Sequence, residues 1–460
     1  MKVIPSKLVP AGKAPMGVRN MSEVEVEIVK LLPNHANSTQ SYSPNGVNRM
    51  QFRIPAFTNS FMDNSRSFLS YKIQITDTAN WEANNVMKMS DTPGGWIQRL
   101  VIKTSSGLVL EDISNYNVLK KILTLMETEE EAHIDEGNYS AIVNTAYKGR
   151  IGQLQSAAPM SYALKFNTGI LSQHLQSYIP LGICDSGPFA FDIEIFLAPF
   201  SDVLEHVSVA AVAAGANPPT GRYQITEPVF NLCLLKVDEA ICKKYNQIAC
   251  DETERVVIPY STFHNHQSSI TSRTQTVFIS DNCTDLKRVY SVFHAPTNVG
   301  LPNVEPFAFL GSVREAAATK VTSYNYKLGN KHIYNEEVAE TDNNNISLNH
   351  FVNAHYKAGK PSSPAMFISK YNKKDITSFA TNYESNKNFV LCPNFTYSEE
   401  SNKGVVQGVS AGGLPITAVF KFEADPNLTN QNFVECGYDL VIQHGQLSYV
   451  EHVLNGEYSY

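Results

Sequence analysis

The sequence is poor in charge and contains no dense cluster of lysine and arginine. Charged residues make up 18% of its 460 residues, and the formal net charge is −7. A protein that wraps nucleic acid directly normally carries a basic excess or a basic arm. We therefore expect no direct, sequence-specific binding of nucleic acid by this chain.

Long hydrophobic runs are also missing. No stretch approaches the roughly 18 apolar residues that a membrane-spanning helix needs. The longest candidate, Val207–Ala216, is short and rich in alanine. The first residues contain Pro5 and Pro10 and lack the apolar core of a signal peptide. The sequence thus predicts neither a membrane span nor a cleaved leader, and it assigns no membrane partner.

Cysteine is too sparse and too irregular to form a disulfide framework. The seven cysteines are odd in number, none precedes residue 184, and no two have C-x-x-C spacing. We expect all seven to be reduced thiols, most of them buried as small apolar side chains. They are Cys184, Cys233, Cys242, Cys250, Cys283, Cys392 and Cys436.

The usual catalytic motifs are absent, with one partial exception. Residues Gly408–Gly412 match the G-x-S-x-G pattern around Ser410, and Asp439 and His444 follow in the order that hydrolases use. That motif requires a helix directly after the serine. Here a β-type run, Ile416–Phe422, follows instead. We expect Ser410 to lie in a glycine-rich loop before a strand, and we predict no catalytic residue.

Two patterns could bind a metal ion. His264 and His266 would share one face of a strand, as ligands can. No obvious third or fourth ligand lies nearby in the sequence, so a polar strand face or loop is expected. The acidic stretch Glu127–Glu136 is typical of a solvated loop. We therefore assign no metal ligand and no cofactor.

The residues that are abundant favour strands joined by polar loops. Asparagine, serine, threonine, tyrosine and phenylalanine are plentiful, and 43% of the residues are hydrophobic. A chain of this length typically forms about two to four domains. Short strand-like runs recur throughout: 50–54, 68–75, 96–103, 161–166, 177–181, 190–198, 228–237, 255–260, 274–279, 287–294, 322–328, 389–395, 415–422 and 436–443.

Two helices interrupt this β-rich pattern. The stretch Gly94–Leu123 reads as a hairpin with a tight turn at Gly107, followed directly by apolar residues at helical spacing up to Met126. Ser114 or Asp112 could cap that helix. A second helix is predicted at Ser347–Lys357. A helix inserted among the strands of a barrel-like sandwich would produce this pattern.

Changes in composition divide the chain into four segments. Residues 1–37 are predicted to form an N-terminal arm with a short alternating strand, and 38–200 a first β domain. The stretch 201–222 contains Pro218-Pro219 among glycine and asparagine, which favours a linker. Residues 223–460 would then form the second β domain.

Four stretches together resemble one protein family. They are SYSPNGVNRMQFRIPAF with SRSFLSYKIQI after it, GGWIQRLVIKTSSGLVLEDISNYNVL, LQSYIPLGI and FVLCPNF. In these stretches the chain resembles the double jelly-roll major capsid proteins of polinton-like viruses and virophages, a lineage shared with adenoviruses. The hairpin that runs into LEDISNYNVL is the most specific of the four.

The resemblance implies a mostly β fold of two tandem eight-stranded jelly-roll barrels with a few decorating helices. It also implies the function of a major capsid protein of a non-enveloped icosahedral double-stranded DNA virus, located in the virion. Three chains would form a pseudo-hexameric capsomer, and penton and minor capsid proteins would be further partners. The family's role is structural, so the resemblance implies no catalytic, cofactor-binding or metal-binding residues.

Two other functions are compatible with a β-rich chain of this length. A tandem β-sandwich that binds carbohydrate would need exposed aromatic side chains, and the only tryptophans are Trp81 and Trp96. A viral spike or penton-type protein is the second alternative. A single-jelly-roll penton would not need two similar domains, and a fibre would show a sequence repeat.

Overall fold

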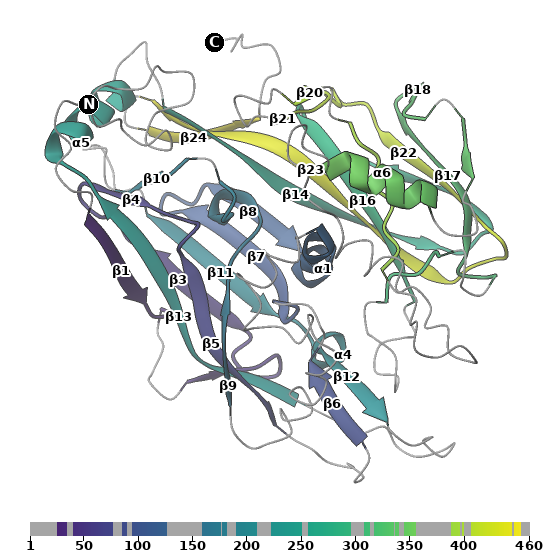
Figure 1. Ribbon diagram of the computed structural model, residues 1–460, viewed down its shortest axis with the longest axis horizontal. Helices are drawn as coiled ribbons and strands as arrows, with labels where there is room; N and C mark the ends of the chain where they lie inside the picture. Colours follow the sequence, from purple (N-terminus) through teal and green to yellow (C-terminus); the bar gives the residue numbers. More distant parts are fainter. Residues whose placement is uncertain are drawn as a thin grey trace.

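The protein is described from a computed structural model (Figure 1), in which strands dominate and a few helices lie against them. No helix in the described part of the chain is long and apolar enough to cross a membrane. The structure describes residues 25–34, 40–76, 85–89, 94–126, 159–175, 177–181, 190–208, 222–250, 256–295, 308–312, 317–334, 336–339, 345–355, 388–395, 398–399, 406–443 and 446–451.

The strands of the N-terminal half form two larger sheets and a separate strand pair. One sheet contains β1 (Glu25–Leu31), β2 (Ser41–Tyr42), β4 (Ser60–Met62), β5 (Phe68–Thr76), β9 (Met160–Leu164), β10 (Ile179–Leu181) and β13 (Arg222–Lys236). The other has the order β3 (Arg49–Ile54), β11 (Phe191–Leu197), β7 (Ile97–Thr104), β8 (Val109–Ser114). The pair is β6 (Asn85–Met89) with β12 (Leu204–Ser208), next to the short helix α4 (Phe200–Val203).

The C-terminal half repeats this arrangement. One sheet has the order β14 (Val256–Ile270), β23 (Leu428–Gln443), β16 (Leu286–His294), and β24 (Gln446–Glu451) also pairs with β23. The other has the order β15 (Thr274–Ile279), β22 (Ile416–Phe422), β17 (Val321–Leu328), β18 (Lys331–His332), with β19 (Val338–Ala339) paired to β17. A small separate pair is β20 (Ser398–Glu399) with β21 (Val406–Gln407).

The strand orders of the two halves correspond in one sheet fully and in the other in part. In each half, one sheet has a path of four strands in which a strand from early in that half pairs with a late strand, which in turn pairs with a strand from the middle. The orders are β3-β11-β7-β8 and β15-β22-β17-β18. In each half, a long final strand, β13 or β23, pairs with an early strand and with β5 or β16. Antiparallel sheets with these connections are jelly rolls. The expected fold, two jelly rolls in one chain, is confirmed.

The two sheets of each half pack face to face through aromatic side chains. In the first jelly roll, Phe52 on β3 lies 6.3 Å from Phe230 on β13, measured between ring centroids. In the second, Phe293 on β16 makes edge-to-face contacts with Phe420 and Phe422 on β22, at 4.9 and 5.5 Å. Each of these sheets therefore has one face in a core, and strands such as β3 and β22 alternate buried with less buried residues.

The predicted hairpin and helix are present. β7 and β8 pair through a tight turn in which Gly107 has a φ of +90°, and α1 (Tyr116–Met126) begins two residues after β8 ends. The capping prediction for Asp112 was wrong, because its carboxylate instead pairs with Arg99 across the hairpin at 2.5–2.7 Å. The backbone carbonyl of Asn115 accepts the first helical N–H groups. Figure 1 shows α1 between the two jelly rolls.

The second helix packs on the second jelly roll and accepts a hydrogen bond from a buried arginine of its sheet. α6 (Asn345–His355) lies against the sheet of β14, β23 and β16 (Figure 1), with Phe351 packed on Tyr290. Arg288 donates from Nε to the carbonyl of Ala354 at 2.6 Å and from Nη1 to Glu435 at 2.9 Å. Burial disfavours the charged form of both residues, but the opposite charge of the partner outweighs it. The pKa of Glu435 is therefore lowered and that of Arg288 is raised.

The predicted domain boundary at residue 222 is corrected by the strand pairing. β13 pairs with β1, β2, β4 and β5, so residues 223–236 close the first jelly roll rather than open the second. The apolar run at 228–237 gave no sign of which sheet it joins. β1 also shows that part of the predicted 1–37 arm belongs to a sheet.

The connection between the two jelly rolls is a helix that the sequence analysis missed. α5 (Glu239–Cys250) follows β13 and precedes β14, and it buries Ile241, Cys242 and Tyr245. Those three positions have helical spacing, and the backbone carbonyl of Asp238 accepts from the first turn. The spacing could have revealed the helix, although many polar residues surround it. A single turn of 3-10 helix, η4 (Gly169–Leu171), completes the described elements.

Candidate functional site

Among the described residues, one group of side chains that could hold a metal ion lies in the second jelly roll, around strands β14 and β23. His264 and His266 are two residues apart on β14 and share a face of the sheet. Cys436 on β23 lies diagonally across from His264, because the register pairs His264 with Val434. The same face carries Phe293, which contacts the opposite sheet, so these side chains project between the two sheets.

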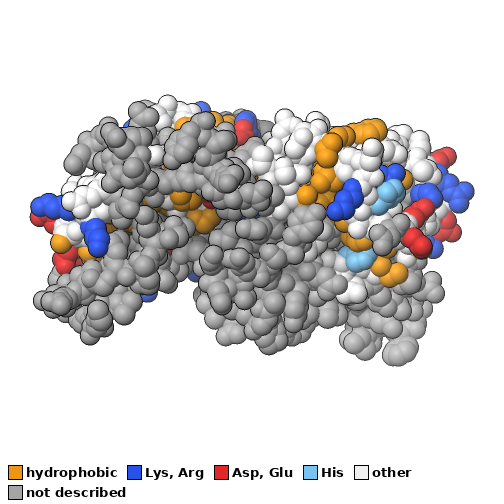
Figure 2. Space-filling model, turned by 90° about the horizontal axis from the view of Figure 1, so that it is seen from above, with side chains coloured by type: hydrophobic (Ala, Val, Ile, Leu, Met, Phe, Trp, Pro, Cys, Tyr) orange, Lys and Arg blue, Asp and Glu red, His pale blue; other side chains and the backbone are white. Residues whose placement is uncertain are grey.

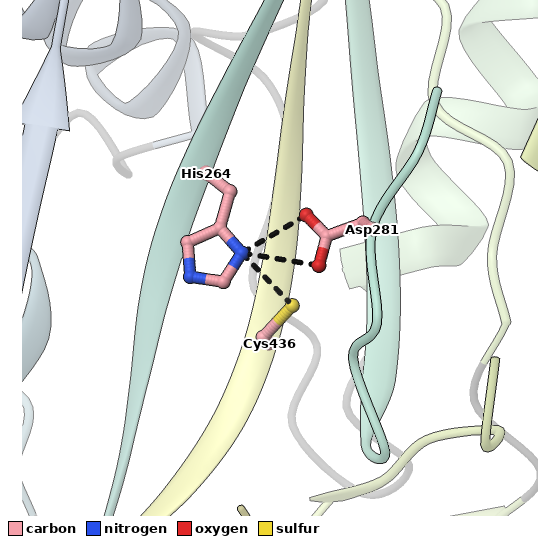
Figure 3. A group of neighbouring side chains, drawn as sticks. All are labelled: His264, Asp281 and Cys436. Atoms are coloured by element: carbon pink, nitrogen blue, oxygen red, sulfur yellow. Dashed lines mark hydrogen bonds and ion pairs between the residues drawn. The ribbon is translucent and has the colours of Figure 1, made fainter. Parts of the chain in front are cut away.

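The segment that connects β15 to β16 supplies the other members of the group. Asp281 lies 2.9 Å from Nδ1 of His264 and 3.0 Å from Nε2 of His266, measured to its Oδ2 atom. The Sγ atom of Cys436 is 3.9 Å from Nδ1 of His264. Figure 3 shows the three side chains of His264, Asp281 and Cys436 converging from three separate segments.

The electrostatics of this group favour an ionised carboxylate. Burial alone would raise the pKa of Asp281, but hydrogen bonds and positive charge from His264 and His266 lower it to about 2. The Asp281 side chain is only 6% exposed, whereas those of the two histidines are 36% and 29% exposed. The carboxylate thus stays charged at neutral pH.

Cys283 lies beside Cys436, and the structure joins the two by a disulfide. The prediction that all seven cysteines are free thiols was therefore wrong for this pair. The two residues are 153 positions apart, so local spacing in the sequence could not predict that the fold brings them together. Cys233, Cys242 and Cys392 are free and buried, as predicted. Cys184 and the side chain of Cys250 lie outside the described part.

The G-x-S-x-G match lies in a loop, as the sequence indicated. Ser410 is exposed and follows Val409, which forms an isolated bridge with Leu286. Gly412 and Gly413 both have positive φ, and β22 follows, so no helix follows the serine. Asp439 is buried on β23. His444 lies outside the described residues, as does the acidic stretch Glu127–Glu136.

One of the two tryptophans considered for sugar stacking is not on the surface. Trp96 is 2% exposed and packs edge-on against Tyr71 at 4.9 Å. Trp81 lies outside the described residues. Trp96 is therefore part of the first core, and its ring is not available to stack on a sugar.

Comparison of the sequence finds no matching family model and no matching curated protein. Comparison of the fold finds solved structures of similar architecture. A chain of the Sputnik virophage matches with a TM-score of 0.60 and 11% identity, over 100% of this chain and 96% of that one. A chain of the PBCV-1 virus capsid matches with a TM-score of 0.58 and 10% identity, over 95% and 99%. The mavirus major capsid protein matches with a TM-score of 0.52 and 12% identity, over 97% of both chains.

These neighbours are double jelly-roll capsid proteins, and this chain shares their fold over almost its whole length. The resemblance that the sequence suggested is thus confirmed at the level of the fold. At about one identical residue in ten, the similarity extends to the architecture and not to individual side chains.

Proposed function

We propose that this chain is the major capsid protein of a non-enveloped icosahedral double-stranded DNA virus. The observation that carries the proposal is the presence in one chain of two jelly rolls, each with a sheet of corresponding strand order. The fold shared with capsid proteins of two virophages and of PBCV-1 supports it. The role is structural and not enzymatic, and it places the protein in the virion.

The duplicated fold favours a trimer as the building block. A shell with local sixfold packing needs six similar faces around each capsomer. Three chains with two similar barrels each present six barrels as a pseudo-hexagon, and a head-to-tail interface closes such a ring. Permanent interfaces of this kind typically bury more than about 2,000 Å². Neighbouring capsomers, penton proteins and minor capsid proteins would be the further partners.

The surface of the isolated chain is compatible with such an assembly. Several large apolar side chains are exposed, among them Ile28 on β1 at 59% and Phe278 on the edge strand β15 at 71%. On the face shown in Figure 2, acidic and basic side chains of the described residues are interspersed. Covering the exposed apolar groups with neighbouring chains would remove them from water.

The test is the mass and shape of the purified protein. Light scattering on the size-exclusion peak should give about three times the chain mass of 51.0 kDa, and negative-stain images should show hexagonal outlines. A protein that stays monomeric at tens of micromolar and physiological salt would contradict the proposal. That result would favour the tandem β-sandwich or spike-type alternatives.

A further inference from the structure

We propose that Cys283, Cys436, His264 and Asp281 form a zinc site in the reduced protein, and that the Cys283–Cys436 disulfide is the alternative, metal-free state of the same cross-link. The donor atoms of His264, Asp281 and Cys436 all lie within 4.8 Å of one another between the sheets. Cys283 is adjacent through Cys436, and His266 contacts the Asp281 carboxylate. A disulfide by itself requires neither an imidazole nor a carboxylate beside it.

The distances between donor atoms fit a tetrahedral ion. Typical zinc bonds to nitrogen, oxygen and sulfur place neighbouring nitrogen and oxygen ligands roughly 3.3 Å apart, and nitrogen and sulfur roughly 3.6 Å apart. Nδ1 of His264 lies 2.9 and 3.2 Å from the two Asp281 oxygens and 3.9 Å from Sγ of Cys436. Shifts of a few tenths of an ångström would therefore suffice for all three to bind one ion.

The remaining groups around the site match the outer shell of a zinc centre. A histidine ligand usually donates its second ring N–H to an oxygen, and Nε2 of His264 lies 3.4 Å from the hydroxyl of Tyr438. His266 can donate to Oδ2 of Asp281 while the other carboxylate oxygen faces the metal. Two thiolates with one imidazole and one carboxylate favour zinc over calcium or magnesium, which prefer oxygen ligands.

Zinc and the disulfide exclude one another, because both need the same two sulfur atoms. Binding of Zn²⁺ to the two thiols releases two protons. A low-molecular-weight disulfide can then oxidise the two thiolates to the Cys283–Cys436 bond. It takes up two electrons and leaves as two thiolates, and the zinc ion is released. In either state the segment before β16 stays linked to β23. For a shell protein made in a reducing cell and released from it, this link would persist in both environments; that consequence rests on the capsid role proposed above.

The experiment measures zinc in the full-length protein, after purification with a phosphine reductant and again after oxidation with glutathione disulfide. The reduced protein should hold about one zinc per chain, and the oxidised protein less than a tenth of that. Cys436→Ser and His264→Gln should each lower the affinity for zinc, measured by chelator competition, at least tenfold. His266→Gln should lower it about tenfold.

Cys233→Ser is the matched control, since Cys233 is also a buried strand cysteine but lies in the first jelly roll. It should bind zinc like the wild type. Reduced wild-type protein that binds less than a tenth of an equivalent, or His264→Gln with unchanged affinity, would overturn the proposal.

Cobalt loading of the wild type is independent of variant folding. It should give thiolate-to-cobalt absorption, and the absence of that absorption would also refute the site. None of these readouts depends on trimer formation, so they are separate from the test of the capsid role.

Discussion

The two jelly rolls share a strand order but fill their interiors differently. The long final strand of the first, β13, buries mainly apolar side chains on its inner face, such as Phe230, Leu232 and Leu234. The corresponding strand of the second, β23, buries Asn430 and Asn432, which bond to one another and to Ser291 on β16. The topology therefore tolerates a polar interior where each polar group has a partner.

The attachment of the two helices follows the same contrast. α1 is packed mainly through apolar side chains such as Val118, Leu119 and Ile122, and it also buries Lys120 and Lys121. α6 is held in part by Arg288, which donates to the Ala354 carbonyl and forms a buried pair with Glu435. Removing part of a buried apolar side chain lowers the unfolding free energy in proportion to the atoms removed. Removing one partner of a buried ion pair costs more, because the other charge stays buried without a partner. Changes in the second barrel should thus have the larger effects.

The largest effect is expected from Arg288→Met. The change leaves Glu435 buried without its cation, and we expect the unfolding free energy of the second jelly roll to fall by about 3–5 kcal/mol. Chemical denaturation followed by intrinsic fluorescence measures the loss. The double variant Arg288→Met with Glu435→Leu removes both charges and should be more stable than the single variant. Equal stability of single and double variants would contradict this account.

A smaller effect is expected from Ile122→Ala in α1. Ile122 is fully buried, and truncating such a side chain typically costs about 2–4 kcal/mol. The matched control is Val109→Ala on β8, where the side chain is 45% exposed and the cost should stay within about 0.5 kcal/mol. Calorimetry should show the loss in the transition of the first jelly roll. Similar losses for both variants would argue against α1 as part of that core.

A pH-dependent effect is expected from a carboxyl group of the first jelly roll. Glu111 is buried beside Thr168 and Gly169, and burial raises its pKa to about 8 although Thr168 partly offsets this. Between its ordinary pKa and about 8, the unfolded chain has lost this proton while the folded chain keeps it. Stability therefore falls as pH rises, by about 1.4 kcal/mol per pH unit, and levels off above pH 8.

Glu111→Gln removes this dependence. From pH 5 to pH 8 the wild type should lose stability while the variant does not, so the unfolding free energy of the variant should rise relative to that of the wild type. Denaturation curves at pH 5, 6, 7 and 8 measure it. Parallel pH profiles for the two proteins would show that Glu111 is ionised in the folded state. The paired Glu435 of the second jelly roll has the opposite shift, to a lowered pKa.

Much of the fold could be predicted from residue patterns, because local patterns report local structure. The hairpin at β7 and β8, helix α1 and most strand positions follow from alternation, turn residues and helical spacing. β14 and β23 extend well beyond their predicted limits, since stretches such as His264–Ser269 and Thr429–Asn432 are polar on both faces. Their strand conformation is imposed by pairing with each other and not by hydrophobic alternation.

The group around Asp281 could be predicted only in part. His264 and His266 stood out by their spacing, but the sequence analysis found no further ligand near them. Asp281 and Cys283 enter from a connecting segment, and Cys436 from a strand far along the chain. The same limitation explains the misplaced boundary, because which sheet β13 joins depends on its pairing with β1 and β5. Contacts between distant segments cannot be predicted from local composition.

The pairing of β1 with β13 also has a consequence for synthesis on the ribosome. Glu25 pairs with Lys236, and Val256 pairs with Ile442, so each barrel closes only after its last strand has been translated. Until then the growing chain presents unpaired strand edges and uncovered apolar faces. Such nascent states fold slowly and aggregate readily. High-level production of this chain should therefore depend on chaperones that hold the nascent barrels until β13 and then β23 emerge.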